Sequence, residues 1–167
     1  QAFIHSIRDS RGEWVTDEAE IEKEAVGYFS NLFTTDPITD YQLLHVIPNL
    51  SSDIDNTGLE EVPSFEEVRK VLFEIDGDSA AGPDGFTGQF FVVAWEVVAQ
   101  HVYRAVVCFF CGAKLSRFVT ATSIVLLPKT MNPNDFTQFR PISVCNFLNK
   151  VISCILVGRL SGVLPRI

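Results

Sequence analysis

Two cations flank a polar turn within the segment 121–147, TATSIVLLPKTMNPNDFTQFRPISVCN. Lys129 follows one apolar run and Arg140 lies at the start of the next. The run 122–127 is rich in β-branched and aliphatic residues, and 139–143 is predicted to be a second short strand, with Pro141 marking it as an edge or bulged strand, so the two predict a hairpin. Lysine offers a mobile point charge and arginine a planar fork for two phosphate oxygens. The pair therefore suits a polyphosphate, although solvated surface charge fits the same spacing.

The charge of the chain is distributed unevenly around this segment. The net charge is −8, which taken alone argues against a nucleic-acid partner. Residues 1–100 hold 5 Lys/Arg against 20 Asp/Glu, whereas residues 101–167 hold 8 Lys/Arg against the single Asp135. Such asymmetry indicates an anionic partner for the basic part. An uneven spread of solvated charge is the alternative interpretation.

A second candidate site is the Gly- and Asp-rich segment 76–91, DGDSAAGPDGFTGQFF. It begins like a calcium-binding loop, but alanines stand at the third ligand position and the obligatory glycine position, and a threonine replaces the bidentate glutamate. It also lacks the Gly-Lys-Ser/Thr of a P-loop. The pattern instead predicts a rigid turn in which Pro83 fixes φ, while Gly82, Gly85 and Gly88 permit close backbone approach.

Helical patterns dominate the rest of the chain. Gly12 is predicted to lie at a turn, and Asp17 is predicted to cap the helix that follows. The apolar side of that helix is formed by Ile21, Ala25, Phe29, Leu32 and Phe33. Ser64 begins a capping box for a second helix. A third helix is predicted over about 88–112, and Gly112 is expected to end it. A fourth is predicted over 146–165, with Asn146 as its N-cap. The residues of this last helix that are predicted to face inward are Leu148, Ile152, Ile155, Leu156, Leu160 and Val163.

The remaining segments are predicted to be irregular or extended. Residues 36–63 read as a connector with one short helix near 43–46, because Pro, Asn, Asp and Ser are frequent there. The strand 122–127 is expected to be buried. Four cysteines, with one C-x-x-C inside an apolar helical pattern, match no zinc site, so we expect free core thiols.

Three of these segments together carry a family resemblance. AGPDGFTGQFFVVAWEVV, SIVLLPKTMNPNDFTQFRPISVCN and KVISCILVGRLSGVLPRI resemble, in order and spacing, the reverse transcriptases of plant non-LTR retrotransposons, the long interspersed element (LINE) type. The opening IRDSRGEWVTDEAEIEKEAVGYFSNLFTT is similar to the segment before the polymerase in those polyproteins. The resemblance covers nearly the whole chain.

The resemblance implies a helix-rich α+β fold, with a short β-hairpin around 121–144. Residues 1–63 would be an N-terminal helical extension and connector. Residues 64–167 would be an incomplete reverse transcriptase domain, comprising the fingers and the start of the palm of a right-hand polymerase.

The implied activity is RNA-directed DNA synthesis by a nucleotidyltransferase. Lys129 and Arg140 would contact the triphosphate of the incoming dNTP. The template side of the fingers would be organised by Gly82, Pro83, Asp84 and Gly85. The expected partners are an RNA template, a DNA primer, the dNTP, and the remaining palm and thumb of the same polyprotein. We expect no membrane partner and a location in the nucleus or cytoplasm.

The catalytic carboxylates of that family are missing from this sequence. The complete polymerase would use Mg²⁺ held by a later Asp motif and a Tyr/Phe-Ala-Asp-Asp box, but the chain contains no Asp-Asp pair. The resemblance therefore assigns no catalytic residue, metal ligand or cofactor here, and the chain alone is expected to be inactive. A non-catalytic protein-interaction module and a decayed pseudogene product remain as alternatives.

Overall fold

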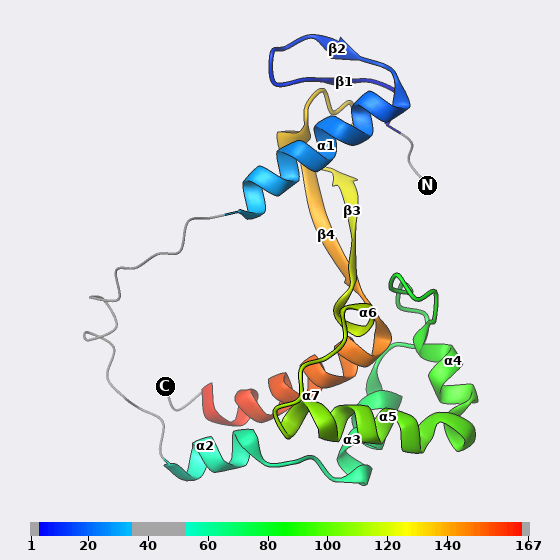
Figure 1. Cartoon of the computed structure of the whole chain (residues 1–167), viewed down its shortest axis with the longest axis vertical. Helices are drawn as coiled ribbons and strands as arrows, with labels where there is room; N and C mark the ends of the chain where they lie inside the picture. Colours follow the sequence, from blue (N-terminus) through cyan, green and yellow to red (C-terminus); the bar gives the residue numbers. More distant parts are fainter. Residues whose placement is uncertain (1–3, 35–52, 165–167) are drawn as a thin grey trace. The chain divides into compact units, whose positions relative to one another are not determined.

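The computed structural model describes residues 4–34 and 53–164, and the side chains of 53–55 lie outside that description. The predicted short helix near 43–46 also lies outside it. The described chain combines helices with two small two-stranded sheets, which confirms the helix-rich α+β class (Figure 1).

Contacts divide the chain into two compact units. Unit 1 consists of Gln1–Pro48 with Val125–Ile142, and unit 2 of Asn49–Ile124 with Ser143–Ile167. The assignment of 1–63 and 64–167 to parts of a polymerase stays a prediction.

Unit 1 begins with a short antiparallel hairpin. Strands β1 (Ile7–Arg8) and β2 (Trp14–Val15) pair with Arg8 opposite Trp14. The connecting turn contains Gly12, whose φ of 86° confirms the predicted turn glycine. The Asp9 carboxylate accepts hydrogen bonds from the backbone N–H groups of Arg11 and Glu13, which holds the loop closed.

Helix α1 (Glu18–Phe33) follows that hairpin. The Asp17 carboxylate accepts from the backbone N–H of Glu20 at 3.1 Å, so the predicted N-cap is confirmed. The prediction that Leu32 and Phe33 complete the apolar side of this helix was wrong, because Leu32 is 53% exposed and Phe33 is 57% exposed. The last turn of α1 contributes no residue to the buried core of unit 1.

The core of unit 1 joins two distant segments of the chain. Ile7, Ile21 and Phe29 from the N-terminal part pack with Phe136 and Phe139 from the region of the second hairpin. The Phe29 and Phe136 rings meet edge to face, with centroids 5.9 Å apart. The end of the second hairpin that carries Phe136 and Phe139 (the hairpin end) is therefore held by the N-terminal segment.

That second hairpin consists of β3 (Thr122–Pro128) and β4 (Phe139–Cys145), with the 3-10 turn η2 (Phe136–Gln138) between them (Figure 1). Both predicted strands are confirmed. The expected burial of β3 was wrong, since all its residues except the half-buried Leu126 are exposed. β-branched residues favour an extended backbone, but burial also requires a covering layer.

Unit 2 is helical, with α2 (Asp53–Glu60), α3 (Phe65–Glu74) and α7 (Phe147–Val163) packed together. Helix α2 was not predicted, since residues 36–63 were expected to be mainly irregular. The Ser64 hydroxyl accepts from the backbone N–H of Glu67, confirming that half of the capping box. In α7, Leu160 is 40% exposed, so its predicted inward position was wrong.

The helix predicted over 88–112 is divided in two. Helix α4 (Gly88–Val93) ends at Ala94, and α5 (Trp95–Phe110) begins from the same residue. Ala94 has a ψ of 9°, which interrupts the helix without a glycine or proline. Gly112, with a φ of 83°, follows the C-cap as predicted.

The buried core of unit 2 joins three of its helices, α3, α5 and α7. Its buried residues are Val68, Leu72, Trp95, Ala99, Val102, Val106, Phe147, Val151, Ile152 and Ile155. A four-residue helix, α6 (Arg117–Thr120), leads into β3. Among the described helices, none combines the length and apolar character that crossing a bilayer requires.

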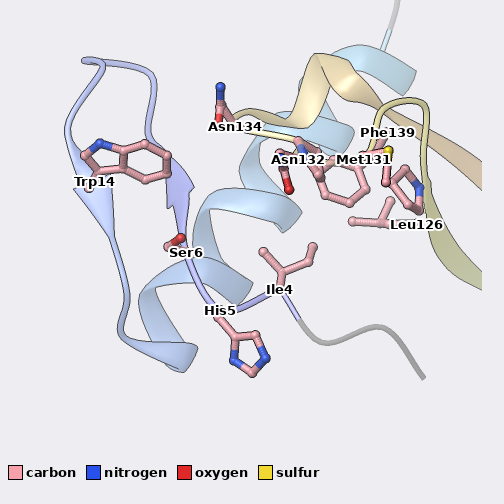
Figure 2. A pocket seen from close by; sticks show the side chains of 11 residues that line it. Ile4, His5, Ser6, Trp14, Leu126, Met131, Asn132, Asn134 and Phe139 are labelled. Atoms are coloured by element: carbon pink, nitrogen blue, oxygen red, sulfur yellow. The ribbon is translucent and has the colours of Figure 1, made fainter.

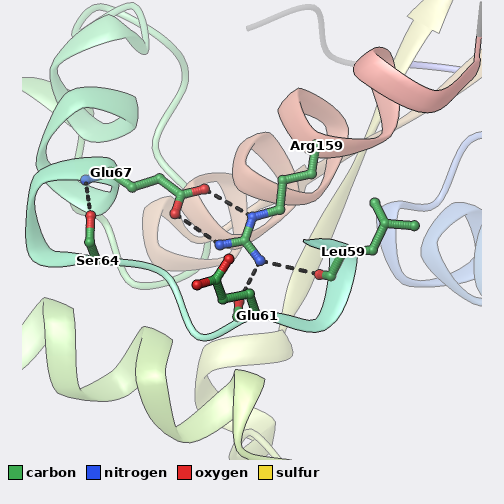
Figure 3. A network of polar contacts seen from close by, with 5 residues as sticks. All are labelled: Leu59, Glu61, Ser64, Glu67 and Arg159. Atoms are coloured by element: carbon green, nitrogen blue, oxygen red, sulfur yellow. Dashed lines mark hydrogen bonds and ion pairs between the residues drawn. The ribbon is translucent and has the colours of Figure 1, made fainter. Parts of the chain in front are cut away.

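Arg159 links three segments of unit 2 (Figure 3). Its guanidinium forms a two-pronged contact with the Glu67 carboxylate, at 2.9 Å from Nε and 2.8 Å from Nη2. It also donates to the backbone carbonyls of Leu59 and Glu61, and it lies 5.0 Å from the centroid of the Phe110 ring. The side chain of Arg159 is only 13% exposed, so these contacts are largely withdrawn from water.

All four cysteines are free, as expected, but the expected core packing was wrong for three of them. Cys108, Cys111 and Cys154 are exposed and Cys145 is half-buried. Because α5 turns Val102 and Val106 into the core, positions 108 and 111 face outward.

Candidate functional site

The glycine-rich motif at 82–85 forms one tight turn in unit 2. The backbone N–H of Gly85 donates to the Gly82 carbonyl at 3.0 Å, with Pro83 and Asp84 between them. Gly85 has a φ of 77°, a conformation that favours glycine. The Asp84 carboxylate accepts from the Phe86 backbone N–H at 3.1 Å, so this side chain stabilises the turn.

Asn146 fixes this turn from the other end of the sequence. The side chain is buried, and its Oδ1 accepts from the backbone N–H of Asp84 at 3.1 Å. Its Nδ2 donates to the Phe118 carbonyl at 2.6 Å. Asn146 is the N-cap residue of α7, as predicted, but its carboxamide forms no capping bond and binds the two loops instead.

Gly82 is required by packing against this asparagine. A Cβ atom at position 82 would lie 2.6 Å from the Cα of Asn146, a distance that side-chain carbons do not adopt. Gly88 is similarly close to a ring carbon of Phe147, at 2.8 Å. The glycines of the segment therefore allow the loop to lie directly on the first residues of α7.

Two further α7 residues strengthen that contact. The Lys150 ammonium donates to the Ala80 carbonyl at 2.7 Å and to the Ser79 hydroxyl at 3.2 Å. The Phe147 ring stacks on Phe91 with centroids 4.7 Å apart. Residues 79–91 are thus anchored by a helix more than fifty positions later in the sequence, through side chains that sequence reasoning did not select.

Lys129 lies at the end of the β3–β4 hairpin in unit 1. Its backbone N–H donates to the Gln138 carbonyl at 2.8 Å, which continues the ladder one residue beyond β3. Its exposed ammonium donates to the Thr137 carbonyl at 2.7 Å. An ammonium has three N–H donors, so two stay available for an anion.

Arg140 is the second residue of β4. The preceding Phe139 is 5% exposed in the core of unit 1, and side chains alternate along a strand, so Arg140 points to the opposite face. It is exposed and makes no hydrogen bond or ion pair with any residue in 4–34 or 53–164. Its five N–H donors are therefore available to a ligand.

The predicted site residues thus fall into two places. Gly82, Pro83, Asp84 and Gly85 form one turn in unit 2, while Lys129 and Arg140 lie near one hairpin end in unit 1. Within the described ranges, no group of three or more His, Cys, Asp or Glu residues could hold a metal ion. No metal-dependent step is assigned to these residues.

The structure is thus that of a helix-rich α+β protein with two candidate sites. One is the hairpin end with Lys129 and Arg140, and the other is the turn at 82–85 that Asn146 holds in place. No family model matches the chain. The chain is 25% identical over 154 residues to the transposon TX1 uncharacterized 149 kDa protein of Xenopus laevis. The alignment covers 90% of this chain and 12% of that protein, so the chain spans about an eighth of its relative's length. This likeness agrees with a relationship to transposable elements.

Proposed function

We propose that the chain is part of the reverse transcriptase of a non-LTR, LINE-type retrotransposon, as its motifs suggest for plant elements. In this role Lys129 and Arg140 bind the triphosphate of the incoming dNTP. The turn at 82–85 contributes to the template side of the fingers. The RNA template, DNA primer, Mg²⁺, and the rest of the palm and thumb belong to the complete polymerase.

The hairpin end carries this proposal. Arg140 is exposed and has no hydrogen-bond or ion-pair partner among the described residues, and Lys129 keeps donors available at the same end of the hairpin. Both are attached to a backbone held by the buried Phe136 and Phe139, so only their side chains have to be ordered when an anion binds. The likeness to a transposon protein along 90% of the chain supports an origin in a transposable element.

Removing either cation is expected to weaken triphosphate binding. Lys129→Ala and Arg140→Ala should each raise the Kd for a dNTP about tenfold, because each removes charge-assisted hydrogen bonds. Binding to the full chain would be measured by calorimetry at low and high salt, and the affinity should fall as salt rises. Arg11→Ala, in the exposed turn of unit 1, is the matched control. Equal losses in all three variants would contradict the assignment.

The chain alone is expected to show no polymerase activity. Its sequence contains no Asp-Asp pair of the kind that holds the catalytic metals in that family, and no group of three or more His, Cys, Asp or Glu residues within 4–34 and 53–164 could hold a metal ion. A primer-extension assay with template, primer, Mg²⁺ and dNTPs should give no product. Template-dependent extension by the pure chain would refute this expectation. In-frame coding sequence after residue 167 with an Asp motif and a Tyr/Phe-Ala-Asp-Asp box would favour a working enzyme over a remnant.

A further inference from the structure

A cavity of about 430 Å³ lies inside unit 1, beside the hairpin end. Trp14 stands at one side of it and Leu126, Met131 and Phe139 at the other, with Ile4 and Ser6 between them (Figure 2). The wall formed by the N-terminal strands and the wall formed by the hairpin are joined by a hydrogen bond from the Arg8 N–H to the Asn134 carbonyl, at 2.7 Å. The cavity is therefore a built part of the unit.

Trp14 supplies an aromatic surface to this cavity. It is 53% exposed although it lies in a strand, and the Arg8 guanidinium carbon is 5.0 Å from its ring centroid. A cation at this distance holds the indole by cation–π attraction. The ring is thus positioned while about half of the residue remains open to a planar ligand.

Two carboxamides add hydrogen-bonding groups to the same cavity. The backbone of Asn134 is engaged on both sides, by Arg8 and by the Gln138 side chain, which fixes its place. The carboxamides of Asn132 and Asn134 themselves make no hydrogen bond with the described part of the chain. Each offers a donor and an acceptor side by side, the pattern that pairs with the edge of a nucleobase.

We propose that this cavity binds a nucleobase, stacked on Trp14 and hydrogen-bonded by Asn132 and Asn134. A volume of about 430 Å³ lies in the range of small-ligand sites and suits one base with its sugar. The described residues of unit 1 hold five Lys/Arg and eight Asp/Glu, a net charge of −3, which disfavours a long phosphate backbone. The base belongs to a free nucleotide or to the unpaired end of a strand.

This site goes beyond the triphosphate contact proposed above, and it can be tested separately. The chain has two tryptophans, and Trp95 is 6% exposed in the core of unit 2. Trp95→Phe in the full chain leaves Trp14 as the only indole reporter. Adenosine, which has a base but no phosphate, should quench its fluorescence, whereas ribose 5-phosphate should not.

Variants of the cavity supply the second readout, by calorimetry with adenosine. Trp14→Leu should weaken binding about tenfold and Trp14→Tyr should restore most of it, because stacking needs a ring. Asn132→Ala and Asn134→Ala should each cost about fivefold. Lys129→Ala and Arg140→Ala should leave adenosine binding unchanged, so failure of the triphosphate proposal would not imitate failure of this one.

Several outcomes would overturn the base site. The first is that no nucleoside at millimolar concentration quenches Trp14 fluorescence. The second is that ribose 5-phosphate quenches it as strongly as adenosine does. The third is that only a proline-rich peptide quenches it. Comparison of AMP with a short oligoadenylate then identifies the source of the base. Tighter binding of the oligomer indicates a strand end, and equal or weaker binding indicates a free nucleotide.

Discussion

Replacing Asn146 with alanine is expected to lower the free energy of unfolding of unit 2 by about 2–4 kcal/mol. The variant leaves the Asp84 N–H and the Phe118 carbonyl without their partner, at a site where Asn146 is 2% exposed. Buried polar groups that lose a partner keep their desolvation cost. Trp95 fluorescence in a Trp14→Phe background would follow the denaturant unfolding of unit 2.

The same variant should loosen the glycine turn locally. Amide hydrogens of Asp84 and Gly85 should exchange faster than in the parent chain, because the anchor of the loop is gone. Asn149→Ala is the matched control, since Asn149 lies in the same helix, is half-buried, and its side chain makes no hydrogen bond with the described residues. It should change stability by less than about 0.5 kcal/mol. A comparable loss in both variants would show that Asn146 has no special role.

Arg159→Ala is expected to destabilise unit 2 by about 2–4 kcal/mol. It removes a two-pronged ion pair and leaves the Glu67 carboxylate and the carbonyls of Leu59 and Glu61 without their donor. Breaking a buried ion pair costs about 3–5 kcal/mol of unfolding free energy. Because the Glu67 side chain is 34% exposed, the expected loss for this pair is somewhat smaller. Denaturant unfolding followed by Trp95 fluorescence, in the Trp14→Phe background, measures this loss.

A surface pair in α3, the helix that carries Glu67, provides the control. Lys70 and Glu74 are 3.9 Å apart with side chains 74% and 64% exposed, so Lys70→Ala should cost less than about 0.5 kcal/mol. Glu67→Gln added to Arg159→Ala should recover part of the loss, because it removes the charge left without a partner. If the double variant is less stable than Arg159→Ala, the Glu67 charge is not the source of the cost.

Sequence reasoning succeeded where a local interaction determines the structure. Asp17 and Ser64 accept bonds from residues three positions later, and Gly12 and Gly112 adopt the positive φ that their turns require. It failed where distant packing decides. Ala94 divides α4 from α5 without any breaker residue, and Trp95 next to it is buried against Phe65 and Phe73 of another helix.

The candidate site follows the same rule. Lys129 and Arg140 could be selected because charged residues are visible in a sequence. Gly82 could be selected because glycine and proline close together indicate a turn. Asn146 could be recognised as an N-cap, but its bonds to Asp84 and Phe118 span 62 and 28 positions. No local pattern indicates such partners, and the position of the Asn132 and Asn134 carboxamides in the same cavity as Trp14 is equally invisible without the fold.

The core shared by Phe29 and Phe136 has a consequence for biosynthesis. About 90 residues separate the end of α1 from the start of the hairpin segment of unit 1, so a ribosome must translate all of them before that core can close. Until then Ile21 and Phe29 on the nascent chain lack Phe136 and Phe139 as neighbours. A premature stop or frameshift anywhere in that interval would leave the N-terminal helix without this core, as a substrate for chaperones and proteases.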